Sequence, residues 1–160
     1  MEWAEVDFEN AVWTIPGAKM KRSVADKVNG EAHIVPLSRQ ALAILRDIRP
    51  LTEHRRFVFP SVRGGDRPMS DMTLNGALQR LGFDTKTDMT AHGFRAMART
   101  MLAERLGQPE AVIEAQLAHV VKDGLGRAYN RTKFSDQRKE LMQIWSDYLD
   151  ELRVQQPKQL

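Results

Sequence analysis

Histidine and arginine side chains in the middle of the sequence are spaced as a phosphate site would need. Thr90 is a good helix N-cap, and the apolar residues after it follow the i, i+3, i+4, i+7, i+8 spacing of one helix face: Phe94, Met97, Ala98, Met101 and Leu102. On that helix His92, Arg95 and Arg99 fall within roughly 60° along one border of the apolar face. Because a helix N-terminus already favours anions, these side chains predict a phosphate site.

Two further residues that could act on a phosphate follow in order. His119 comes after the apolar residues Val112, Ile113 and Leu117, and Tyr129 stands ten residues later. A histidine and an arginine three residues apart occur in many helices without any function. The ordered set of His92, Arg95, His119 and Tyr129 is more specific, and it suggests phosphoryl transfer on DNA.

Several segments, taken in order, carry a resemblance to a known family. They are Trp13-Thr14-Ile15-Pro16, Met20-Lys21, His33-Ile34-Val35-Pro36-Leu37-Ser38, Val58-Phe59-Pro60-Ser61, His92-Gly93-Phe94-Arg95, Ile113-Glu114, Leu117-Ala118-His119, Ala128-Tyr129-Asn130-Arg131 and Trp145-Ser146-Asp147-Tyr148-Leu149. Over nearly its whole length the chain resembles the tyrosine recombinases, and among them the prophage integrases of the satellite-phage type.

The resemblance implies a reaction and a role for each motif residue. Tyr129 would attack a DNA phosphate and form a 3′-phosphotyrosyl link, while Arg95 would clamp a non-bridging oxygen through its planar guanidinium. His92 and His119 would hydrogen-bond the phosphate and shuttle protons. Lys21 matches the general acid that protonates the leaving 5′-oxygen. The reaction would need no nucleotide cofactor.

Some of these assignments have alternatives. Tyr129 alone could be an ordinary half-buried tyrosine, a fate that suits Tyr148 on the apolar stripe of the last helix. Lys19 lies two residues from Lys21 and competes with it for the general-acid role. The four histidines are too scattered for a convincing metal site, so we predict no metal.

Composition limits the class of protein. The 160 residues, 42% of them hydrophobic, suit one domain with a real core. The sequence has no cysteine, no run of eighteen apolar residues and no signal peptide, so we expect a soluble, cytoplasmic protein that does not engage a membrane. The net charge is only +3, but basic residues cluster locally. The side chains expected to contact DNA are Lys19, Arg22, Lys27, Arg63, Arg67, Arg99 and Arg131.

The expected fold is α+β and mostly helical, with a small three-stranded antiparallel sheet packed beside a helical bundle. Strands are predicted at 6–8, 12–15 and 32–35, with a polar loop between the second and the third. Ser38 should cap a helix that Pro50 ends, and Ser70 a helix that Gly82 ends, with Met72, Leu74, Leu78 and Leu81 facing inward. Pro109 should open a helix that runs to about His119, and Ser135 should begin the last helix.

The family pattern is incomplete at the N-terminal edge. Family members carry a first clamping arginine before the hairpin, and here it would precede Met1. We therefore expect residues 1–153 to be a catalytic domain truncated at its N-terminal edge, with a polar tail at 154–160, and expect the isolated chain to be inactive.

The function predicted from these observations is site-specific recombination, in which a prophage or genomic island integrates or excises. Its partners would be double-stranded DNA attachment sites and other integrase protomers in a synapse. A non-catalytic DNA-binding module, or a degenerate prophage integrase remnant, is the alternative.

Overall fold

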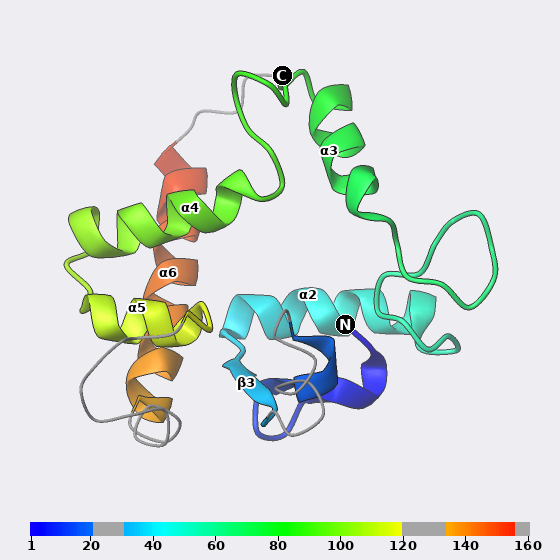
Figure 1. Ribbon diagram of the computed structural model, residues 1–160, viewed down its shortest axis with the longest axis horizontal. Coiled ribbons are helices and arrows are strands. Elements are labelled where there is room, and N and C mark those ends of the chain that lie inside the picture. Colours follow the sequence, from blue (N-terminus) through cyan, green and yellow to red (C-terminus); the bar gives the residue numbers. More distant parts are fainter. Residues whose placement is uncertain (21–30, 120–133, 156–160) are drawn as a thin grey trace.

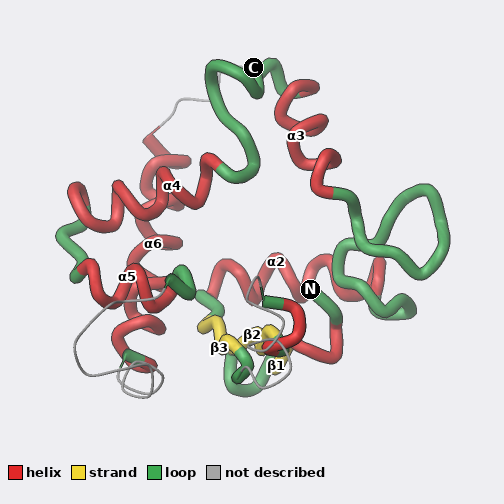
Figure 2. Tube along the Cα trace, in the orientation of Figure 1, coloured by secondary structure: helices red, strands yellow, loops and turns green. Residues whose placement is uncertain are grey.

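The computed structural model describes residues 1–20, 31–119 and 134–155. In this part of the chain a three-stranded antiparallel sheet lies against helix α2, while α4, α5 and α6 pack together beside it (Figure 1). Helix α3 stands apart from both groups, as the tube in Figure 2 also shows. The predicted fold class, a mostly helical α+β domain with a small sheet beside a helical bundle, is confirmed.

The sheet has the order β1-β2-β3, formed by Val6–Asp7, Val12–Ile15 and His33–Pro36. Asp7 closes the first turn, because its carboxylate accepts the backbone N–H groups of Glu9 and Asn10, both at 2.9 Å. Phe8, predicted to be in the first strand, instead stacks on Trp3 of the short 3₁₀ helix η1 (Trp3–Glu5) with ring centroids 6.2 Å apart. A second 3₁₀ turn, η2 (Gly17–Lys19), follows β2.

Helix α2 (Arg39–Thr52) begins as predicted at Ser38, whose hydroxyl accepts the Ala41 N–H at 3.2 Å. The Ser146 hydroxyl of α6 donates to the same oxygen at 2.7 Å, which joins the two helices. The prediction that Pro50 ends the helix is wrong. Proline has no N–H to donate to the carbonyl four residues earlier, but the Glu53 N–H still bonds the Arg49 carbonyl at 2.8 Å, so the last turn continues past Pro50.

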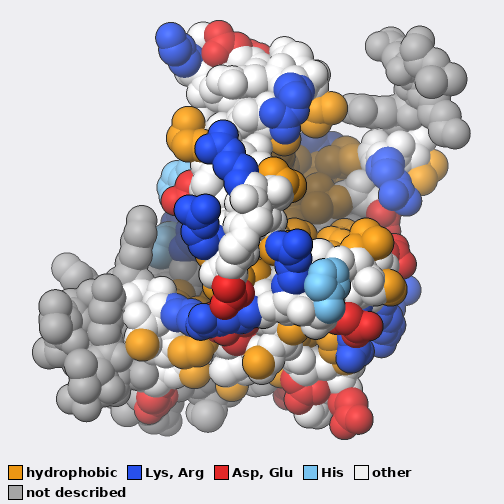
Figure 3. Space-filling model, turned by 90° about the vertical axis from the view of Figure 1, so that its right-hand side faces the viewer, with side chains coloured by type: hydrophobic (Ala, Val, Ile, Leu, Met, Phe, Trp, Pro, Cys, Tyr) orange, Lys and Arg blue, Asp and Glu red, His pale blue; other side chains and the backbone are white. Residues whose placement is uncertain are grey.

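Helix α3 (Asp71–Arg80) ends as predicted at Gly82, which has a φ of +92°. Three of the four apolar residues predicted to face inward do not, and only Leu78 is half-buried. Met72 is 72% exposed and Leu81 74% exposed, and Leu74 is also exposed. Helical spacing predicts which residues share a face, but it does not show whether another element covers that face. Figure 3 shows hydrophobic side chains open to solvent on this side of the molecule.

The main core lies between α4, α5 and α6. Helix α4 (Gly93–Thr100) continues into the π-helical turn η3 (Met101–Arg105), and α5 (Glu110–Gln116) and α6 (Ser135–Gln155) pack against them. Leu102, Val112, Ile113 and Leu141 are buried together, and Trp145 packs on them from α6. No helix in the described ranges is long and apolar enough to cross a bilayer.

The predicted start of α4 needs a small correction. The assigned helix begins at Gly93, and Thr90 closes the turn before it, because its hydroxyl accepts the Gly93 N–H at 3.0 Å. Asn75 of α3 accepts the Ala91 N–H at 2.9 Å and holds the same turn. Phe94, predicted on the buried face, is 46% exposed, since the start of α4 extends beyond the core.

Candidate functional site

Arg95 and His119 meet where the first turns of α4 approach the C-terminal end of α5. The Arg95 Nη2 atom lies 3.0 Å from the His119 Nε2 atom and also donates to the Leu117 carbonyl. Two residues 24 positions apart in the sequence thus share one hydrogen-bonded group. A guanidinium next to an imidazole offers several N–H donors to an anion, as phosphate binding requires.

The direction of His119 is set by the backbone that ends α5. The His119 N–H bonds the Glu114 carbonyl at 3.0 Å and the Ala118 N–H bonds the Ala115 carbonyl at 3.2 Å, which is the Schellman pattern. Ala118 has a φ of +54°, in the left-handed region that favours glycine. Helix α5 therefore ends at Gln116, slightly before the predicted end near His119, and the chain reverses there toward Arg95.

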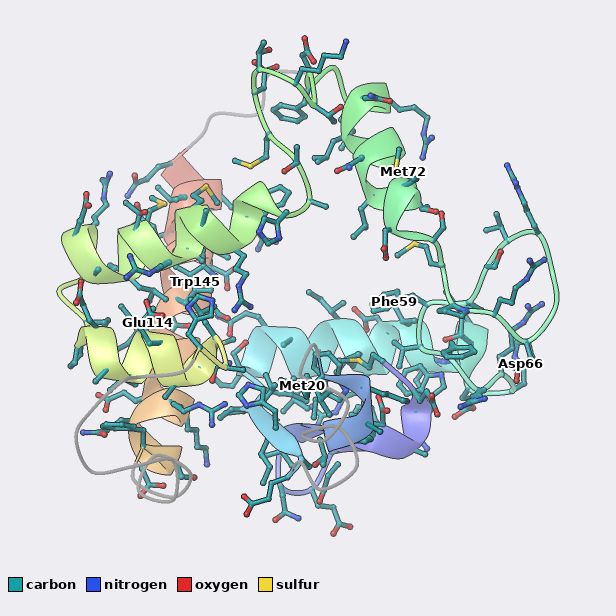
Figure 4. All side chains as sticks on the ribbon, viewed as in Figure 1. Met20, Phe59, Asp66, Met72, Glu114 and Trp145 are labelled. Atoms are coloured by element: carbon teal, nitrogen blue, oxygen red, sulfur yellow. The ribbon has the colours of Figure 1, made fainter. Side chains whose placement is uncertain are left out.

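Glu114 joins both helices of the site. Its Oε1 atom accepts from Arg99 Nε at 2.5 Å, and its Oε2 atom pairs with His119 Nδ1. Donation from His119, followed by that from Arg99, outweighs partial burial and lowers the pKa of the Glu114 carboxyl. The carboxylate is therefore ionised at neutral pH. Figure 4 shows Glu114 on α5, on the side that faces α4.

Lys19 lies in a separate cluster of charges. Its ammonium group is paired with the carboxylates of Glu2 and Glu5, and Arg56 donates to Glu2 at 3.0 Å. Hydrogen bonds to Glu2 and then to Glu5 raise the pKa of Lys19. A lysine held between two carboxylates is a poor proton donor and has little charge left for a phosphate.

The comparisons with known proteins identify the family. Residues 1–136 match the phage integrase family. The chain belongs to this family. It is 44% identical over 145 residues to prophage integrase IntA of Escherichia coli K12, covering 91% of this chain and 33% of that protein. It is 38% identical over 154 residues to the integrase of Enterobacteria phage P4, covering 92% of this chain and 35% of that integrase.

The integrase of Shigella phage Sf6 is 32% identical over 152 residues, with 94% of this chain and 37% of that integrase covered. The chain thus spans about a third of the length of the curated integrases it matches. No solved structure shows a significant match to it.

The structure brings together only part of the set predicted for this integrase-family chain. Arg95, Arg99 and His119 are linked through Glu114 and Leu117, and His92 is exposed at the start of α4. Five predicted site residues lie outside the described residues: Lys21, Arg22, Lys27, Tyr129 and Arg131.

The two predicted DNA contacts Arg63 and Arg67 are elsewhere. Both lie in the exposed loop between α2 and α3, on the opposite side of the molecule from α4 and α5 (Figure 1). Arg67 lines a cavity of about 470 Å³ with Arg55, Arg56 and Asp66. Because Asp66 and Glu2 already pair with Arg56, only part of the positive charge here is free for a phosphate.

Sequence reasoning missed two residues that organise the site. The sequence shows Glu114 only as part of a family motif, although it lies five residues before His119. Arg138 of α6 is 9% exposed and donates to the Gln116 side chain at 2.8 Å and the Ile34 carbonyl at 2.5 Å. It ties α5 and β3 to α6. Burial lowers the pKa of its guanidinium.

In the parts of the chain that are described, no cluster of three or more histidine, aspartate or glutamate side chains is arranged for a metal ion.

Proposed function

We propose that this integrase-family chain cleaves and rejoins DNA strands in site-specific recombination, through a 3′-phosphotyrosyl intermediate. Family membership supports the class of reaction. The observation that carries the proposal is the pairing of Arg95 with His119 across two helices. The substrates would be double-stranded attachment sites of a prophage or genomic island, bound by several protomers in a synapse.

In the proposed reaction Tyr129 is the nucleophile. Its hydroxyl oxygen forms a bond to phosphorus, the bond from phosphorus to the 5′-oxygen breaks, and the phenolic proton passes to His119 or His92. Lys21 donates a proton to the leaving 5′-oxygen. The phosphotyrosyl bond keeps the energy needed for rejoining, so no nucleotide or metal cofactor enters the scheme. The charge pairs around Lys19 favour Lys21 as the acid.

Arg95 would change partners when DNA binds. Its Nη2 atom serves a backbone carbonyl and an imidazole nitrogen, both uncharged acceptors when the ring is neutral. A phosphate oxygen is a charged acceptor, and charge-assisted hydrogen bonds are roughly twice as strong as neutral ones. The scissile phosphate would therefore displace one of these contacts, and Arg95 would stabilise the charge that develops on the equatorial oxygens.

A covalent trap tests the proposal. A nicked double-stranded substrate that loses its 5′-hydroxyl fragment should leave DNA attached to the polypeptide, and Tyr129→Phe should abolish the adduct. Tyr148→Phe is the matched control, because the buried Tyr148 hydroxyl has no hydrogen-bond partner in the described residues and its loss should change nothing. An adduct that survives Tyr129→Phe contradicts the assignment.

The role of Arg95 can be measured in the same assay. A clamping cation can contribute roughly 10³- to 10⁵-fold in phosphoryl transfer, so Arg95→Gln should lower the adduct rate by about that factor. The cytoplasmic location stays a prediction.

That the 160-residue chain alone is inactive also stays a prediction. To test it, we suggest assaying this chain beside the same chain extended by the sequence encoded upstream. DNA binding without any adduct in either polypeptide favours the non-catalytic alternative.

A further inference from the structure

Glu114 has a contact geometry beyond that of an ordinary surface ion pair. Its side chain is only 21% exposed, and each carboxylate oxygen has its own partner, Arg99 Nε at 2.5 Å and His119 Nδ1. Residues Val112 and Ile113, immediately before it, are buried in the core. The carboxylate is thus attached next to a buried part of α5, whereas both of its partners are about half exposed.

These contacts determine which nitrogen of His119 carries the proton. An ionised carboxylate can only accept hydrogen bonds, so the Nδ1 atom facing Glu114 must be protonated. On the other side of the ring, Arg95 can only donate. In the neutral imidazole the Nε2 atom is therefore the acceptor, with its lone pair toward the guanidinium of Arg95 at 3.0 Å. Both neighbours favour the same tautomer.

This arrangement has a consequence for the reaction. When a phosphate takes the Arg95 N–H, the Nε2 lone pair is freed beside the phosphate and can accept a proton. The resulting imidazolium donates from Nε2 to a phosphate oxygen, and the Glu114 carboxylate on the opposite nitrogen balances its charge. Without Glu114 the ring is free to rotate or to present a proton at the wrong nitrogen.

We infer that Glu114 is a positioning residue, which orients His119 and keeps its Nε2 atom ready to receive and return the proton. The inference rests on the proposed function, since it gives Glu114 a role in the same reaction. The competing interpretation is purely structural, with Glu114 only linking α4 to α5 through Arg99. The two interpretations differ in what the His119 ring does when Glu114 or Arg99 is replaced.

Nitrogen NMR of the histidine-labelled 160-residue chain separates them, because the sequence has only four histidines and His119→Asn assigns the signal. Arg95→Met leaves Glu114 alone to select the tautomer, and we expect neutral His119 to remain protonated at Nδ1. Adding Glu114→Ala should shift it toward the Nε2-protonated form, whereas adding Arg99→Gln should not. An Nδ1–H ring that persists without Glu114 overturns the inference.

The adduct assay supplies the second readout. It uses the 160-residue chain or the chain extended upstream, whichever forms the adduct. Glu114→Ala should slow adduct formation by about 10²-fold, the lower end of what a positioned acid–base group contributes. Glu110→Ala, an exposed change on the same helix, is the control and should keep the original rate. Equal rates for these two variants also overturn the inference. If Glu114→Ala changes the tautomer but even the unsubstituted protein forms no adduct, the proposed function is refuted. The inference that Glu114 places His119 then still stands.

Discussion

Replacing Arg138 by methionine should loosen the attachment of α5 and β3 to α6. The guanidinium makes two hydrogen bonds from a site that is 9% exposed, one to Gln116 and one to the Ile34 carbonyl. A hydrogen bond from a charged donor contributes about 1.5–3 kcal/mol, so losing both costs at least about 3 kcal/mol. Methionine avoids the desolvation of the charge, which offsets part of this loss, and we expect a net destabilisation of about 2 kcal/mol.

Urea denaturation followed by circular dichroism measures the change. With a slope of about 2 kcal/mol per molar urea, the midpoint should fall by about 1 M. Arg138→Lys keeps the charge but loses the guanidinium fork, so its urea midpoint should lie between those of the unsubstituted chain and Arg138→Met. Lys139→Met, an exposed change at the next position, controls for the loss of a cation from α6. A midpoint for Arg138→Met equal to that of Lys139→Met would refute the reasoning.

Three further predictions concern charge, DNA and assembly. The pKa of Glu2 is lowered from 4.5 to about 2, first by Arg56 and then by Lys19. The contribution of ionised Glu2 to folding stability is therefore complete above pH 4.5 and is lost as the pH falls toward 2. The difference in urea midpoint between Glu2→Gln and the unsubstituted chain should shrink over that interval. A constant difference contradicts this. DNA binding should be weak and largely sequence-independent, with a Kd on the order of 10⁻⁴ to 10⁻⁶ M. Replacing both Arg63 and Arg67 by glutamine should reduce the slope of log K against log salt concentration by about 2 in a fluorescence titration. Binding that does not change with salt argues against a basic face. Trp145 packs on its own core, so the chain should be monomeric in light scattering at micromolar concentration, and a dimer that Trp145→Ala dissociates would contradict packing in cis.

Local patterns predicted most of the elements correctly. The Ser38 cap and the Gly82 stop each depend on residues only a few positions apart, so the sequence contains the whole cause. The exposed face of α3 could not be predicted in this way. Whether Met72 is covered depends on where distant elements lie, and spacing within one helix carries no information about that.

The candidate site was predictable to a similar extent. Helical geometry placed Arg95 and Arg99 on one border of α4. Arg99 reaches Glu114 of α5, and Arg95 reaches His119 in the turn that follows α5. The contact between Arg95 and His119 did not follow from helix spacing, because the two residues lie in different segments of the chain. The role of Glu114 needed the fold itself, since its two partners lie on opposite sides of it in the sequence and meet only after α4 and α5 pack.

The left-handed backbone at Ala118 means that a residue without any reactive group controls where His119 lies. A β-branched side chain at this position would resist a φ of +54° and turn the chain elsewhere, displacing the imidazole while every polar side chain of the site is kept. Glycine or asparagine would preserve the turn. In variants of this protein, the identity of residue 118 is thus a compact indicator of whether the histidine after it can still reach the arginine.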